Sequence, residues 1–96
     1  MMFATRMTLS EQRCLMKLEQ QLVKNQGFIS LPAFESDHME TLQRWQQQGH
    51  LVLNADRISE IPAELVKQRG ITHGCEFSDE LWVASASLRR IIAHGL

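Results

Sequence analysis

The stretch from Phe28 to Leu53 constrains the fold most, because it reads as strand, turn, helix, stop and strand in direct succession. Asp37 and Glu40 have the spacing of a capping box, which predicts the start of a helix. Gly49 is typical of the position just beyond a helix C-terminus. We therefore predict a strand–helix–strand unit on which the remaining chain packs. The apolar positions on one face of its helix are Met39, Leu42 and Trp45.

A second amphipathic helix precedes this unit. Thr8 and Glu11 form another capping-box pattern, and the helix is expected to run to about Gln26 and to end at Gly27. Residues 1–7 carry no pattern, so we expect them to be frayed. The predicted buried stripe of this helix consists of Cys14, Leu15, Leu18 and Leu22.

The segment after the central unit predicts a turn, a short helix and a strand. Residues 54–56 form a turn pattern, and Pro62 suits the first turn of a helix over residues 63–69 that Gly70 ends. Residues 71–77 alternate in polarity, which is typical of a strand. The expected inward positions are Leu65 and Val66 in the helix, and Ile71, His73, Cys75 and Phe77 in the strand.

The C-terminal segment has two interpretations. Either Ser78 caps one long helix over residues 79–94, or residues 81–84 form a strand and a helix starts near Ser85. We favour the long helix, because acidic residues open it and basic residues close it, which suits the helix dipole. Its expected inner arc is Leu81, Ala84, Leu88, Ile91 and Ile92.

Trp82 and Val83 fall outside this arc. An outward tryptophan next to a β-branched residue is a candidate subunit contact, so we expect a homodimer that uses these two residues. If the segment is a strand instead, Trp82 covers the sheet.

Composition limits the class of protein. Ninety-six residues predict one domain, 1–96, and 44% hydrophobic with 22% charged residues is ordinary for a globular chain. The net charge of −1 gives no overall attraction to nucleic acid or membranes. Without a long apolar segment or a disulfide framework, we expect a cytoplasmic protein with no membrane partner and with reduced thiols. The predicted fold class is α+β, a helix-rich small domain with a short two- or three-stranded sheet.

Two polar surfaces are candidates for DNA contacts. Arg13, Lys17 and Lys24 form a basic stripe on the first helix that suits phosphates, although an ordinary solvated helix face is the simpler interpretation. The outer face of the central helix offers residues that read base edges. Those residues are Gln43, Arg44 and Gln47.

The charges around the central helix oppose this interpretation. Asp37 and Glu40 would repel phosphate at the helix N-terminus, and Glu40 has the spacing to pair with Arg44.

His73 and Cys75 are the best candidates for metal or nucleophilic chemistry. On a strand their side chains share a face, but a structural zinc site needs four ligands and the sequence has no second closely spaced pair. Cys14 and His94 could complete a site only if the fold brought them close. A buried free cysteine that behaves as an apolar group is the simpler interpretation. We therefore predict no enzyme, no metal and no cofactor.

Helix, short strand, helix and a strand entered through Gly49-His-Leu-Val-Leu53 resemble the core of a winged helix-turn-helix domain. The resemblance takes residues 28–31 as the first strand, 39–48 as the recognition helix and 50–53 as the first wing strand. Only residues 31–36 remain for the family's additional helix, and the wing would have to contain the helix over residues 63–69.

The resemblance implies a dimeric, DNA-binding transcriptional regulator whose recognition helix faces duplex DNA. The alternative is a non-catalytic adaptor that forms a homodimer and binds a protein partner, which near-neutral charge favours. A third hypothesis is a small enzyme that uses Cys75. A continuous positive face would favour DNA, whereas mixed charge would favour an adaptor.

Overall fold

The computed structural model describes residues 7–95, with side chains through residue 90. Within these residues the chain is an α+β domain with four α-helices, two short 3₁₀ helices and a three-stranded antiparallel sheet, which confirms the predicted class. Of the segment predicted to be frayed, residues 1–6 lie outside the described residues, whereas Met7 is buried in the core. The elements are α1 (Leu9–Lys24), β1 (Phe28–Ile29), η2 (Leu31–Ala33), α2 (Ser36–Gln47), β2 (Leu51–Asn54), η3 (Ala55–Glu60), α3 (Ala63–Arg69), β3 (His73–Phe77) and α4 (Asp79–Gly95).

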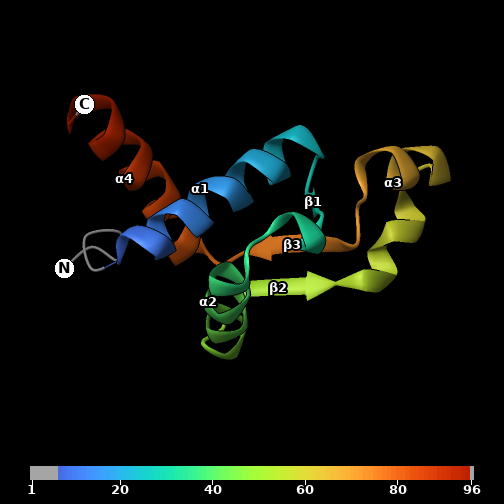
Figure 1. Ribbon diagram of the computed structural model, residues 1–96, viewed down its shortest axis with the longest axis horizontal. Coiled ribbons are helices and arrows are strands. Elements are labelled where there is room, and N and C mark those ends of the chain that lie inside the picture. Colours follow the sequence, from blue (N-terminus) through green and yellow to red (C-terminus); the bar gives the residue numbers. More distant parts are fainter. Residues whose placement is uncertain (1–6, 96) are drawn as a thin grey trace.

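The sheet has the order β1-β3-β2, so the last strand in sequence lies in the middle. Leu53 pairs with Cys75 and Ile29 pairs with His73. In Figure 1, β2 leads to η3 and α3 at one end of the sheet, and β3 runs back to α4 at the opposite end. The two ends of the sheet therefore carry different helices, and α1 and α2 contact each other between them.

The N-terminal helix follows its sequence pattern closely. The Thr8 hydroxyl accepts a hydrogen bond from the Glu11 amide at 3.1 Å, and the Glu11 carboxylate accepts one from the Thr8 amide at 3.0 Å. The helix ends at Lys24, slightly earlier than predicted, because Gln26 and Gly27 both have positive φ angles, of 56° and 99°. The buried stripe is confirmed as Cys14, Leu15, Leu18 and Leu22.

The central helix starts differently from the prediction. Glu35 is its N-cap and makes no side-chain capping bond, so Asp37 lies inside the first turn and the predicted Asp37–Glu40 capping box is wrong. The stop is as predicted, because Gly49 has φ 78° and its amide bonds to the Gln46 carbonyl. Leu42 and Trp45 are buried and Met39 is half-buried, while His38 and Thr41 are buried in addition.

Two short elements differ from the sequence prediction. The first strand stops at Ile29, because the segment around Pro32 turns into η2. Helix α3 has the predicted bounds but buries no side chain, so Leu65 and Val66 are only half-buried. Strand β3 buries Cys75, with His73 and Phe77 half-buried on either side of it, and Ile71 is buried just before the strand.

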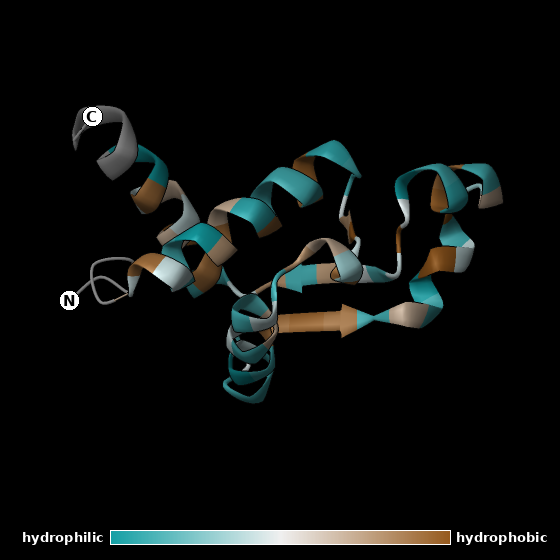
Figure 2. Ribbon diagram, viewed as in Figure 1, coloured by the Kyte–Doolittle hydropathy of each residue, from teal (hydrophilic) through white to brown (hydrophobic). Residues whose placement is uncertain are grey.

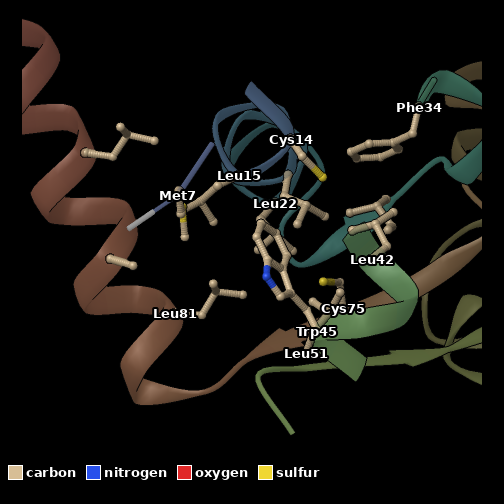
Figure 3. Close-up of a cluster of buried hydrophobic side chains, with 14 residues drawn as sticks. Met7, Cys14, Leu15, Leu22, Phe34, Leu42, Trp45, Leu51, Cys75 and Leu81 are labelled. Carbon is tan, nitrogen blue, oxygen red and sulfur yellow. The ribbon is translucent and has the colours of Figure 1, made fainter. Parts of the chain in front are cut away.

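The C-terminal segment is one helix, α4, so the strand interpretation of residues 81–84 is wrong. Leu81, Ala84 and Leu88 are buried as predicted, whereas the side chains of Ile91 and Ile92 lie outside the described residues. The core lies where α1, α2, α4 and the sheet meet, with Trp45 among the side chains from these elements (Figure 3). In Figure 2, most of α2 is coloured as hydrophilic, whereas β2 is hydrophobic along most of its length.

Candidate interaction surfaces

The basic stripe on α1 does not form a free cationic surface. The Lys17 ammonium donates a hydrogen bond to the Ala33 carbonyl and lies 5.5 Å from the centre of the Phe34 ring. Lys24 is exposed at the opposite end of the helix from Arg13. Lys17 therefore serves to attach η2 to α1, and the two remaining members of the stripe are separated from each other.

The arginine of α2 is paired with an acid from another helix. Arg44 Nη2 lies 2.9 Å from Glu11 Oε2, so the intrahelical Glu40–Arg44 pair expected from the sequence is replaced by a bridge between α2 and α1. Its side chain is 47% exposed, and that of Glu11 is 19% exposed. Gln43 and Gln47 are exposed on α2 and carry no charge that would attract phosphate.

A hollow of about 330 Å³ lies beside the starts of α1 and α2. Its lining mixes charges, with Arg13 from α1 and Glu35 and Asp37 from the start of α2. The N-terminus of α2, where a DNA-reading helix would meet its site, is therefore flanked by negative charge. His38 also lines the hollow, and its Nδ1 has no hydrogen-bond partner among the described residues.

Several other arginines are engaged by groups of the chain itself. Arg89 lies 3.1 Å from Glu19, and Arg57 lies 3.2 Å from Glu60. Arg69 donates a hydrogen bond of 2.9 Å to the Lys24 carbonyl. Each of these three arginines is thus held by an acid or a carbonyl of the chain itself.

The cysteines are placed as structural residues. Cys14 and Cys75 are both free and buried, and burial raises the thiol pKa of each to about 12. His73 directs Nδ1 to the Thr72 hydroxyl at 2.7 Å. Among the side chains of residues 7–90, no three metal-ligating groups are gathered to hold an ion, and the side chain of His94 lies outside the described residues. The protonated thiol of Cys75 is a poor nucleophile at neutral pH.

The outer side of α4 carries an apolar surface. Trp82 is 44% exposed and Val83 is 60% exposed, as expected from their place outside the inner arc. The Trp82 ring packs against Phe77, with ring centroids 4.8 Å apart, so its orientation is restrained by the end of β3. Val52 on β2 is a further exposed apolar residue, at 56%.

No protein-family model, curated protein or solved structure matches the chain. None of the helices within residues 7–95 combines the length and the apolar character that a membrane span requires.

Proposed function

We propose that this chain is a non-catalytic protein-interaction domain of winged-helix type that works as a homodimer in the cytoplasm, without a metal or cofactor. The observation that carries the proposal is the contrast between two surfaces. The apolar face around Trp82 and Val83 on α4 is uncovered, while cations near the candidate DNA-reading helix are engaged by the chain's own acids and carbonyls. An exposed apolar patch on a soluble domain is typical of a protein-binding surface.

The connectivity supports the winged-helix part of the proposal. Helix α2 lies between β1 and β2 in sequence, and the sheet order β1-β3-β2 is that of a winged helix. The segment between β2 and β3, with η3 and α3, takes the place of the wing. In this proposal, the short η2 corresponds to the family's additional helix, because it lies between β1 and α2 and contains Pro32.

The charge pattern supports interaction with protein over interaction with DNA. Arg44 is already bridged to Glu11, and Asp37 lies in the first turn of α2. Duplex DNA attracts proteins mainly by its phosphates, so a helix with acids at its leading end gains little from approaching it. A mixed surface of this kind suits a protein partner, where charge sets specificity and apolar contacts supply the affinity.

The oligomeric state tests this proposal. Light scattering after size exclusion should give a dimer mass at high micromolar concentration, and Trp82→Glu should convert it to a monomer. Val23→Glu is the matched control, because Val23 is 72% exposed on α1 and its replacement should leave the mass unchanged. A strictly monomeric wild-type chain would refute the proposal, and so would a dimer that tolerates Trp82→Glu.

Duplex DNA is the second candidate partner, favoured by the exposed Gln43 and Gln47 on α2 and by the winged-helix connectivity. Fluorescence anisotropy with a mixed-sequence duplex at low salt decides between the candidates, because the electrostatic attraction is strongest there. We expect no binding. Saturable binding would favour the DNA-binding regulator instead. In that case Arg44→Ala should reduce the discrimination between bases at one position of the site by about 1–3 kcal/mol.

A further inference from the structure

We infer that the partner covering α4 is a second copy of this chain, with the two α4 helices antiparallel and Asp79 of each copy opposite Arg90 of the other. The inference rests on the proposed homodimer and specifies its orientation and register. It follows from a stripe of four residues on the outer face of α4, called here the α4 stripe: Asp79, Val83, Ala86 and Arg90.

The α4 stripe is a single line along the helix. At about 100° per residue, its four members fall within roughly 60° of one another on the helix surface. Asp79, Val83 and Arg90 are exposed and Ala86 is half-buried. Buried Ser87 borders the stripe beside Val83, and the other buried residues of α4 lie on the far side of the helix, so the stripe itself is available for another surface. Those other buried residues are Leu81, Ala84, Ser85 and Leu88.

The order of residues along the α4 stripe is self-complementary. Asp79 and Arg90 lie equally far from the midpoint between Ala84 and Ser85, and the same holds for Val83 and Ala86. A two-fold axis through that midpoint makes the helices antiparallel and brings each residue opposite its counterpart in the pair. Each charged contact then joins a carboxylate to a guanidinium, whereas a parallel arrangement would join like charges.

The two charges at the ends of the stripe are available for such a contact. Arg89, the neighbour of Arg90, is held by Glu19 at 3.1 Å. Neither Asp79 nor Arg90 has an ion pair with a side chain of residues 7–90. Their pairing across the two-fold axis therefore requires no existing bridge to break.

The sizes of the central residues also fit. Val83 of one copy meets the small Ala86 of the other, which allows the two helices to approach closely. Trp82 lies beside the stripe and is already oriented by Phe77 at 4.8 Å, so covering it costs little side-chain entropy. Figure 1 places α4 and α3 at opposite ends of the sheet, so this contact leaves the η3–α3 end free for another partner.

A charge-reversal experiment on the full chain tests the register. The dimer dissociation constant is measured by sedimentation velocity over a range of concentrations for wild type, Asp79→Arg, Arg90→Asp and the double variant. Each single change turns two attractive contacts per dimer into two repulsive ones, so we expect the constant to rise by about tenfold or more at low salt. The double variant restores opposite charges and should recover most of the wild-type affinity.

Glu80→Arg is the matched control, because Glu80 lies next to Asp79 but off the α4 stripe and its side chain is 73% exposed, even with a 3.6 Å contact to His50. It makes the same charge change at the start of the helix, so circular dichroism separates loss of helix from loss of the contact. The inference is overturned if the double variant dimerises as weakly as the single variants, or if Glu80→Arg has the same effect as Asp79→Arg. If Trp82→Glu disrupts the dimer but the charge reversals leave its dissociation constant unchanged, only the register is overturned. A monomeric wild type would overturn the proposed function as well.

Discussion

Replacing Leu18 by alanine should destabilise the domain strongly, because its side chain is fully buried in the core, at 0% exposure. Removing the buried atoms of a leucine costs about 2–3 kcal/mol of lost transfer free energy. A cavity of roughly 50 Å³ left unfilled would add about 1 kcal/mol more. We therefore expect the free energy of unfolding to fall by about 3–4 kcal/mol. A chain of this size has about 5–14 kcal/mol in total, so the effect is large.

Urea unfolding followed by circular dichroism measures this change directly. Leu9→Ala is the matched control, because Leu9 lies on the same helix and is 61% exposed, and it should change the free energy of unfolding by less than about 0.5 kcal/mol. Near-equal effects of the two substitutions would refute the packing of α1 described above. A loss below about 1 kcal/mol for Leu18→Ala would show that the site is solvated or collapses fully.

Two further predictions concern buried polar groups. Burial raises the pKa of Cys75 to about 12, so the folded chain keeps this proton while the unfolded chain releases it near the ordinary thiol value of 9.0. The free energy of unfolding should therefore fall as pH rises from about 9 towards about 12. Replacing both Cys14 and Cys75 by alanine should flatten this pH dependence, measured by urea unfolding at each pH. An unchanged dependence of the unfolding free energy on pH would contradict the burial of the two thiols. Glu19→Ala should lower the free energy of unfolding by about 1–3 kcal/mol, because the buried Ser85 hydroxyl donates a hydrogen bond to the Glu19 carboxylate. Glu60→Ala is the control and should cost less than about 1 kcal/mol, because the side chain of Glu60 is 54% exposed in its pair with Arg57. Equal losses in thermal unfolding would argue against a buried contact between α1 and α4.

Local patterns were sufficient to predict the helices that begin and end on short-range interactions. The capping box of Thr8 and Glu11 and the leucine stripe define α1, and Pro62 with Gly70 brackets α3 within the predicted bounds. These features depend on residues three or four apart, so the sequence alone contains the information. The exposure of Trp82 followed from the same periodicity once the segment was taken as a helix.

The candidate surfaces depended on contacts between elements and were predicted less well. Lys17 has the spacing of a phosphate-binding stripe, but its ammonium reaches Ala33, which lies on another element. Arg44 has Glu40 four residues before it, yet it pairs with Glu11 on α1. Both outcomes depend on how α1 crosses the chain that follows it, which no short-range pattern specifies.

The sequence by itself determined the number and type of the main helices, the apolar faces they bury and the α+β class, because capping and periodicity are properties of neighbouring residues. Only the tertiary structure decided that Met7 belongs to the core, that α3 buries no side chain and that β3 lies between β1 and β2. The tertiary structure also decided which acidic side chain pairs with each of the basic side chains in the ion pairs described above. The physical reason is that long-range pairing is selected by packing of the whole core, and a side chain takes whichever partner that packing brings within reach.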